Sequence, residues 1–599
     1  MGVFRRRMRL VAVGELSCRW HRRLILRLSP GYRMSIPTSS VPSIASEVST
    51  SPSEWWPETL PVTPIRARAD RAGERVYIAI SLLATAYVAV GGAVGLPLLI
   101  RSAQQGQWAL VAALAATLIV SVLTALQVSA FSVFSAILLY RACTLHASLR
   151  FVQAPPVVPD EQLPAVTIQI PGRNEPLRVV RRSIESVLLM NYPTAKLQVQ
   201  YLDNSDPGCW EDVRAYCESV GVEVLHRKGT QGFKAGNLNM GLQSARGELI
   251  GLLDVGDTFP SSAVRYVAAE FLQDSSLGFV QTVQEINNAD ESLIARCESH
   301  MVDALQRFGL GVWSHYGLTP LGGHGVLIAK RALLSIGGWD ESLVSEDWAA
   351  GCAMSIRGWH GKWVDYAAAG EASPTTLDQL QQRSRKWATG ATELLRRKLP
   401  EYLRSGLPWR HRLDLTVRLS TMGCNIIRHL GIQLCLIWCG VAIASTAPSG
   451  AVAYGLGMTL VQWVYPLMFG VQALLYVREG RWARATGVLV FFPLYVAYNV
   501  LVMVHTALGV ASGLYRRVNV FTITPKDMVG HGGWLHFLGR QRWVLGSVGL
   551  VVAAMGGVAA MGRWELVMVA LPLVVYGALV LAGLSVLAFA ETRRSRTSE

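Results

Sequence analysis

Five long stretches without a charged side chain constrain this chain more than any other feature of its sequence. They cover residues 76–100, 109–140, 430–477, 543–562 and 566–590. A helix that crosses the ~30 Å hydrocarbon core of a bilayer needs about 20 apolar residues, and the stretch 430–477 is long enough to cross twice. We therefore predict about six transmembrane helices, arranged as three hairpins.

The composition also favours a membrane protein. Only 16% of the 599 residues are charged, whereas about 25% is usual for soluble domains. Much of the net charge of +15 is Arg beside apolar stretches, so we expect anionic lipid headgroups as the partner and no nucleic acid. The nine Cys include no C-x-x-C pair, which argues against a zinc site and a disulfide framework and favours a reducing compartment.

Residues 485–515 are also apolar and contain no Asp, Glu, Lys or Arg, but their path is ambiguous. Seven crossings would put the Arg-rich ends of the chain on opposite sides of the membrane, against the tendency of basic residues to stay in the cytoplasm. We therefore predict an interfacial helix over 485–515, with a seventh span as the alternative. Both tails then face the cytoplasm, a basic and disordered one over 1–75 and a short one over 591–599.

Residues 152–402 change to soluble character, and strand patterns alternate with helical ones. The expected strands cover 166–170, 197–202, 249–253 and 278–283, and the expected helices cover 177–190, 210–219 and 235–245. Such alternation predicts an α/β domain with a mostly parallel sheet and helices on both faces. Ligands of these folds bind beyond the carboxyl ends of the strands, so the residues that follow each strand are the informative ones.

Acidic and amide side chains follow three of these strands, in segments 171–175, 203–206 and 254–257. Hard oxygen ligands suit Mg²⁺ or Mn²⁺, so three such segments at one edge predict a divalent-cation site. The alternative is ordinary turn chemistry, because Asp, Asn and Gly end strands in many proteins. The chain contains neither G-x-x-x-x-G-K-[ST] nor G-x-G-x-x-G, so its sequence does not support a P-loop or a dinucleotide site.

A set of motifs in this domain resembles glycosyltransferase family 2. Their order and rough spacing match over 166–390, and the membrane-embedded processive synthases of cellulose, hyaluronan, chitin and mannan are closest in layout. A further motif, Phe521 to Lys526, is similar to the gating loop of cellulose synthases. The motifs are Pro171-x-x-Asn174-Glu175, Asp203, Lys234-Ala-Gly-Asn-Leu-Asn239, Asp254, Val280-Gln281-Thr282, Gly337-Gly338-Trp339, Ser345-Glu346-Asp347 and Lys386-Trp387.

The resemblance implies an arrangement for the whole chain. A cytoplasmic GT-A-type, Rossmann-like α/β domain would be inserted in an α-helical transmembrane bundle. The expected parts are a transmembrane hairpin over 76–140, the GT-A domain over 152–402, interfacial helices over 403–429, a second hairpin over 430–477, the interfacial helix over 485–515, the gating loop over 516–542 and a last hairpin over 543–590.

The resemblance also implies roles for single residues. Asp347 would be the general base that takes a proton from the acceptor hydroxyl, assisted by Glu346, although acids at a helix start also suit an N-terminal turn. Trp387 would stack on the acceptor sugar, with a place in the core as its alternative. The remaining acceptor contacts would be Gln281, Gly323 and His324, and the nucleotide-sugar contacts would be Pro171, Asn174, Glu175, Asp203, Lys234, Asp254 and Lys526. The alternatives are an ordinary loop for His324 and a solvated helix start for Lys234.

Two motifs depart from the family pattern. The family's D-x-D would put its second acid at position 256, but the chain has Gly256 there and Asp257 one position later. Because Gly readily takes a positive φ, we predict a bulge that lets Asp257 join Asp254 in holding Mg²⁺ or Mn²⁺. The family's Q-x-x-R-W, anchored on Trp387, is also displaced. Its basic residues here, which we expect to clamp the diphosphate, are Arg383, Arg385 and Lys386.

These features predict an integral protein of the plasma (inner) membrane with its catalytic domain and both termini in the cytoplasm. It would be an inverting glycosyltransferase that takes a hexose from a nucleotide sugar, with UDP-glucose as the favoured donor. The acceptor would be a growing β-linked polysaccharide, which the helical bundle would carry outward. The alternatives are transfer of one sugar to a lipid, and a catalytically lapsed homologue that acts as a membrane scaffold or channel.

Overall fold

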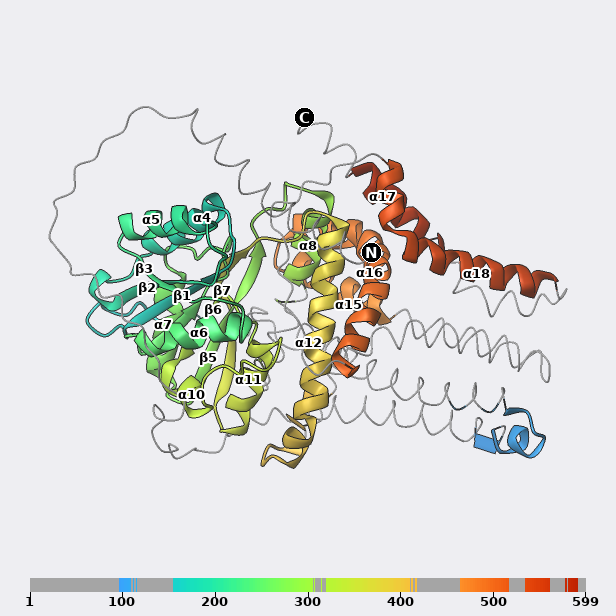
Figure 1. Cartoon of the computed structure of the whole chain (residues 1–599), viewed down its shortest axis with the longest axis horizontal. Helices are drawn as coiled ribbons and strands as arrows, with labels where there is room; N and C mark the ends of the chain where they lie inside the picture. The colour runs from blue at the N-terminus through green and yellow to red at the C-terminus, as the bar shows by residue number, and fades with distance from the viewer. Residues whose placement is uncertain are drawn as a thin grey trace, which may run out of the picture.

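A seven-stranded mixed sheet forms the centre of the middle domain in this computed structural model (Figure 1). The structure describes residues 154–304, 319–409, 464–515, 534–560 and 580–590, with a few more around 96–115, 306–314, 411–416 and 577–578. The strands are β1 (Val166–Gly172), β2 (Leu197–Asp203), β3 (Glu223–His226), β4 (Leu249–Leu252), β5 (Leu277–Ile286), β6 (Val326–Ala329) and β7 (His360–Glu371).

The strand order is β3-β2-β1-β4-β6-β5-β7, and β6 runs antiparallel to both of its neighbours. All other neighbouring strands are parallel, as the alternating pattern predicts. Register places Gly172 of β1 opposite Asp203 of β2, so the segments that follow these strands meet at one edge. The strands β3, β6 and β7 were not expected. For β6, four apolar residues between two loops carry too weak a pattern.

Helices cover both faces of this sheet. The expected helices and strands are confirmed within one to three residues at each end. In α4, the buried Val180, Ile184 and Val187 recur at helical spacing and pack on the sheet. The helices of this layer are α4 (Leu177–Leu188), α5 (Glu211–Ser219), α6 (Phe233–Ser244), α7 (Ala263–Gln273), α10 (Lys330–Ser335) and α11 (Glu346–Ile356).

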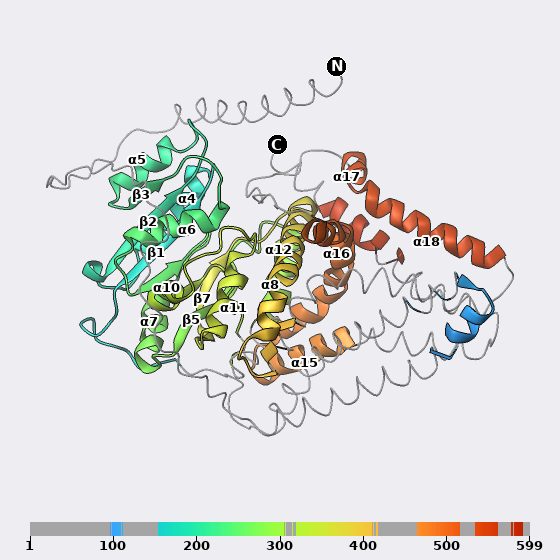
Figure 2. The ribbon, with the colours of Figure 1, turned by 60° about the horizontal axis from the view of Figure 1, so that its bottom comes forward.

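A second group of helices lies beside the sheet domain, with α12 (Leu377–Arg404) between the sheet and α16 (Trp482–Tyr515) in both ribbon views (Figure 2). A capping box of Thr376 and Gln379 starts α12. An apolar core separate from that of the sheet joins this group. Its other helices are α8 (Leu293–Ala304), α15 (Val464–Arg478), α17 (Trp534–Arg540) and α18 (Arg542–Ala560).

Two glycines let α12 and α16 approach each other closely. A Cβ atom at Gly509 would lie 2.5 Å from the carbonyl oxygen of Arg385, and one at Gly513 would lie 2.7 Å from that of Thr389. The Thr389 hydroxyl donates a hydrogen bond to the carbonyl oxygen of Gly509 at 3.1 Å. Small residues four apart therefore bring backbone against backbone at this interface.

Among the described residues, no single helix is both long and apolar enough to cross a membrane. The segments Trp482–Asn499 and Leu501–Tyr515 meet the criteria together, but they are bent by 46° relative to each other. Most of the other predicted spans, residues 516–533 of the predicted gating loop with Lys526, and both tails lie outside the described residues. The rest of that loop, 534–542, forms α17 and the start of α18.

Replacement of Gly509 by Ala should destabilise the protein. The added methyl group would collide with backbone rather than with a flexible side chain, and over-packing of this kind costs about 1–3 kcal/mol. The midpoint of thermal unfolding of the purified protein should fall. The matched control is Gly470→Ala in α15, where a Cβ atom meets nothing within 4 Å, so its midpoint should stay or rise. Equal midpoints for the two variants would contradict the close contact.

Candidate active site

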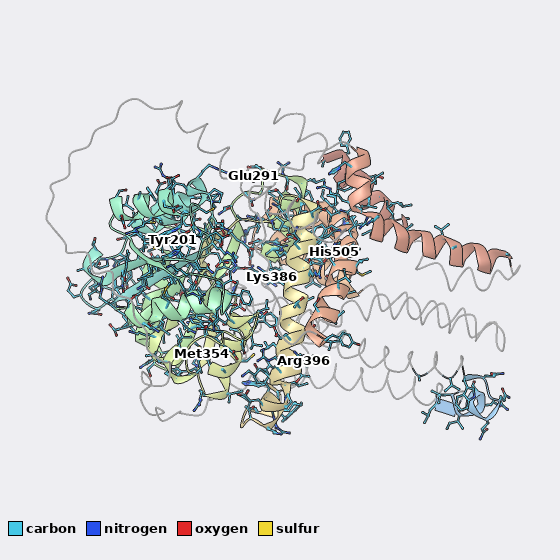
Figure 3. The ribbon with its side chains drawn as sticks, viewed as in Figure 1. Tyr201, Glu291, Met354, Lys386, Arg396 and His505 are labelled. Carbon is cyan, nitrogen blue, oxygen red and sulfur yellow. The ribbon has the colours of Figure 1, made fainter. Side chains whose placement is uncertain are left out.

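A polar cavity of about 210 Å³ lies between the edge of the sheet and α12. Figure 3 shows Lys386, one of its lining residues, on the side of α12 that faces the sheet domain. Six segments distant in sequence contribute its walls: the start of α6, the end of β4, the loop after β5, the loop before β6, the start of α11, and the end of β7 with α12. The predicted site residues on these walls are Lys234, Asp254, His324, Glu346, Asp347, Arg383, Lys386 and Trp387.

Lys234 connects three of these segments. Its ammonium lies 2.6 Å from a carboxylate oxygen of Asp254 and donates to the carbonyl oxygen of Gly323 at 3.0 Å. Glu346 lies 3.9 Å away on a third segment. Burial lowers the pKa of Lys234, but Asp254 and Glu346 together raise it above its ordinary range, so the ammonium stays charged. Lys234 is thus an internal cation of the site and not a solvated helix start.

Asp347 and Glu346 begin α11 at the wall of the cavity. Burial raises the pKa of Asp347 against the opposing charge of Lys234, and burial together with Asp347 raises that of Glu346. One Asp347 oxygen accepts a hydrogen bond from the backbone N–H of Trp348 at 2.7 Å. A carboxylate held in this way favours the neutral form more than a surface acid does, as a proton acceptor requires.

The loop before β6 touches Asp347 through a glycine. Gly323 has a φ of +78°, and a Cβ atom there would lie 2.3 Å from the Asp347 carboxylate. Gln281 of β5 holds the same loop, because its oxygen accepts from the N–H of Gly322 and its amide donates to the carbonyl oxygen of His324. Gln281 is buried and supports the loop. This corrects the expectation that Gln281 lines the acceptor side.

Asp257 forms an ion pair with His324 in place of the expected partnership with Asp254. Gly256 has the predicted positive φ of +93°. The turn, however, carries one Asp257 oxygen to within 2.9 Å of His324 Nδ1, and the other accepts from the N–H of Ala372 at 3.2 Å. Burial lowers the pKa of His324, but Asp257 outweighs it and the pKa rises to about 9. The structure therefore places Asp257 as the counter-ion of His324, which corrects its prediction as a cation ligand.

The three expected clamp residues of α12 do not share one face. Arg383, Lys386 and Trp387 line the cavity, as spacings of three and four residues in a helix allow. Arg385 is exposed and outside the cavity wall, about 200° around the helix from Arg383. The guanidinium of Arg383 is paired with Glu298 of α8. Lys386, whose pKa is lowered by burial, is therefore the clamp candidate that faces the cavity.

The remaining predicted nucleotide contacts form a second group beside the cavity, at the ends of β1 and β2. Asp203 is fully buried and accepts hydrogen bonds from Ser205, with His226 Nδ1 at 2.7 Å. Asn174, with a φ of +53°, donates from its backbone N–H to the Ser205 hydroxyl. Pro171 lies in β1, and Glu175 follows Asn174. The structure brings none of these four residues onto the cavity wall.

Two acids near the cavity were missed by sequence reasoning. Glu371 ends β7 on the cavity wall, and burial raises its pKa. Glu298 holds Arg383 from α8. The rule that polar residues after strands mark a site would have found Glu371 had β7 been recognised. No local pattern marks Glu298, which is one polar residue on a half-buried helix.

The acids around the cavity fit a divalent cation in one limited way. Among the described residues, no group of three His, Cys, Asp or Glu side chains is placed to hold a metal ion. Asp254 is 39% exposed and faces the cavity. Mg²⁺ is commonly held by one or two carboxylates together with substrate phosphates and water. Asp254 alone could supply the protein ligand of such a site.

The comparison with protein families identifies the domain that contains this cavity. Residues 164–390 match the family described as "Glycosyltransferase like family 2". This segment is a glycosyltransferase family 2 domain. The family 2 domain includes every described residue of the cavity wall and the motifs quoted above, apart from the loop that contains Lys526.

Relatives of this domain include named synthases. The chain is 30% identical over 261 residues to the cellulose synthase catalytic subunit [UDP-forming] of Pseudomonas fluorescens, covering 42% of this chain and 34% of the relative. It is 26% identical to cellulose synthase 2 of Novacetimonas hansenii, covering 67% of this chain and 24% of the relative. The chain thus spans a quarter to a third of the length of these relatives.

Solved structures are more distant. A mannosyltransferase of Pyrobaculum calidifontis in complex with GDP-Man and Mn²⁺ is 18% identical, with a TM-score of 0.42, covering 61% of this chain and 98% of that chain.

The ion pair of His324 predicts a loss of stability at high pH. Because folding raises the pKa from 6.5 to about 9, the stabilisation is complete below pH 6.5 and disappears as the pH rises through 9. The full difference is on the order of 3 kcal/mol. Between pH 7 and 10 the unfolding midpoint should therefore fall more for the parent protein than for His324→Gln.

His360→Gln is the control for this pH dependence, since His360 pairs with the half-exposed Asp274. That variant should follow the parent protein. An identical pH dependence for the parent and His324→Gln would show that the pair contributes nothing.

Proposed function

We propose that this protein is a glycosyltransferase that adds hexose units from a nucleotide sugar to a growing β-linked polysaccharide. One observation carries the proposal: the half-buried Asp347 shares its cavity with two basic side chains, Lys234 and Lys386, and with the half-exposed ring of Trp387. A base, positive charge for a leaving diphosphate and a surface for a sugar ring are what sugar transfer requires. The family 2 domain and its cellulose synthase relatives support this chemistry.

The reaction we propose is a single displacement with inversion. The Asp347 carboxylate accepts the proton of the acceptor hydroxyl while that oxygen forms a bond to the anomeric carbon of the donor sugar. The bond from this carbon to the diphosphate oxygen breaks, and the diphosphate leaves with the electron pair. Gly323 keeps space for Asp347, because a side chain there would displace the carboxylate.

Positive charge would stabilise the leaving diphosphate. Lys234 and Lys386 both line the cavity and supply fixed charge from two directions. A divalent cation held by Asp254 would neutralise further charge on the diphosphate when bound. Lys234 contacts Asp254 in this structure. When a nucleotide and its cation bind, Asp254 would contact the cation and Lys234 would contact a phosphate instead.

The finer part of the proposal concerns substrate and location. We propose UDP-glucose as donor, since the relatives named above are cellulose synthases, and reaction at the cytoplasmic face of the plasma membrane with export of the polymer. Incubation of membranes with labelled UDP-glucose, UDP-N-acetylglucosamine and GDP-mannose tests the donor. A labelled polymer on a gel supports processive synthesis, and a labelled lipid supports single transfer instead.

Replacement of Asp347 by Asn should lower the rate of transfer by about 10²–10⁴-fold, because Asn keeps the shape but cannot accept the proton. Nucleotide affinity should stay nearly unchanged. Turnover and nucleotide binding by the purified protein check both statements. Asp290→Asn is the control, as Asp290 is an exposed acid that pairs with Arg296. Near-normal turnover of Asp347→Asn would reduce Asp347 to a residue of the helix start.

The two acids after β4 should differ in their effect on metal-dependent nucleotide binding. Asp254→Asn should remove most of the gain in UDP affinity that Mn²⁺ provides, because Asp254 faces the cavity. Asp257→Asn should retain that gain and change the pH dependence of stability, because Asp257 neutralises His324. Calorimetric titration of UDP with and without Mn²⁺ measures this difference. Equal losses in the two variants would restore Asp257 as a cation ligand.

A further inference from the structure

A buried ion pair links the cavity to two helices outside the sheet domain. The guanidinium of Arg383 in α12 contacts a carboxylate oxygen of Glu298 in α8, and the two side chains are 12% and 4% exposed. The hydroxyl of Tyr498 in α16 donates to the other oxygen of Glu298. Both oxygens of this acid are therefore used, one by each neighbouring helix.

The charge of Arg383 is balanced by protein acids. Burial lowers the pKa of Arg383, but Glu298 and Glu371 together raise it. A guanidinium that already faces two carboxylates offers little net charge to a phosphate. This environment argues against Arg383 as a diphosphate clamp, so its place in the cavity wall has to serve another role.

The guanidinium of Arg383 also contacts the aromatic ring of Trp387. The central carbon of Arg383 lies 4.8 Å from the centre of the Trp387 ring, one helical turn further along α12. This distance is within the range of cation–π contacts. Trp387 is 45% exposed and lines the cavity, so Arg383 supports one part of the ring while another part stays open to a ligand.

We propose that Glu298 is a positioning residue for acceptor binding, which acts on Trp387 through Arg383. The carboxylate fixes the guanidinium, the guanidinium fixes the indole ring, and the exposed part of the ring binds the acceptor saccharide. The role of the saccharide rests on the proposed function, but the chain of contacts does not. A buried acid on α8 thereby determines affinity for a ligand that it does not touch.

The test measures binding rather than turnover. Cellohexaose and UDP are titrated separately into the purified full-length protein by calorimetry. Glu298→Gln should weaken cellohexaose binding by about five- to tenfold, the order expected for loss of a partly buried cation–π support, and leave UDP affinity within about twofold. Tyr498→Phe removes the hydroxyl that orients Glu298 and should act in the same direction by a smaller factor, with less risk to folding.

A double-variant cycle separates positioning from general destabilisation. If Glu298 acts through Arg383, the pair Glu298→Gln and Arg383→Ala should bind cellohexaose no more weakly than Arg383→Ala alone. Arg383→Lys should bind cellohexaose as weakly as Arg383→Ala does, because Lys keeps the charge but loses the planar group. Glu218→Gln is the control, since Glu218 forms an exposed pair with Arg214.

Several outcomes would overturn the inference. Loss of UDP affinity in Glu298→Gln would return Arg383 to the diphosphate clamp. Unchanged cellohexaose affinity, or losses that add in the double variant, would leave Glu298 with a structural role only. If the parent protein transfers no sugar yet binds cellohexaose in a Glu298-dependent way, the proposed function fails while this inference stands.

Discussion

The contacts of the Lys234 ammonium hold the cavity together. Asp254 follows β4, whereas the adjacent acids Glu346 and Asp347 begin α11, and the three carboxylates would repel one another without a cation among them. Lys234 lies between them and also binds the loop before β6. The acids offset the free-energy cost of burying the Lys234 ammonium, and the charge of the ammonium offsets the repulsion among the acids. Asp347, which we propose as the base, the loop that makes room for it and Asp254, which we propose as the cation ligand, are thus positioned around one side chain.

Much of the sheet domain could be predicted from the sequence, because strands such as β1 and helices such as α4 carry strong local periodicity. Lys234, Asp254, Asp347 and Trp387 were selected by the resemblance to family 2; the first three follow a strand or lie at the start of a helix, and Trp387 lies inside α12. These residues meet in one cavity, as the topology of the sheet requires. Local pattern was sufficient where a residue's position in its own strand or helix decides which way it points.

The errors arise where a partner distant in sequence decides the direction. The positive φ of Gly256 was predicted correctly, but Asp257 pairs with His324, from a loop that precedes a strand too short to recognise. Arg385 was grouped with its neighbours by charge, although helical rotation puts it outside the cavity wall. Arg383 was predicted to clamp the diphosphate because no sequence pattern indicates its partner Glu298, 85 residues earlier.

The glycine contact between α12 and α16 has a mechanical consequence. If α16 rotated about its axis by one residue, about 100°, the side chain of Leu508 or Val510 would meet the backbone of α12 at the place that Gly509 now occupies. That steric lock couples the two helices, so a tilt or shift of α16 has to carry α12 with it. Trp387 stands on the locked turn of α12, next to Arg385 and Ala388, which Gly509 contacts. A displacement of α16 would consequently move Trp387, the surface where we place the sugar chain.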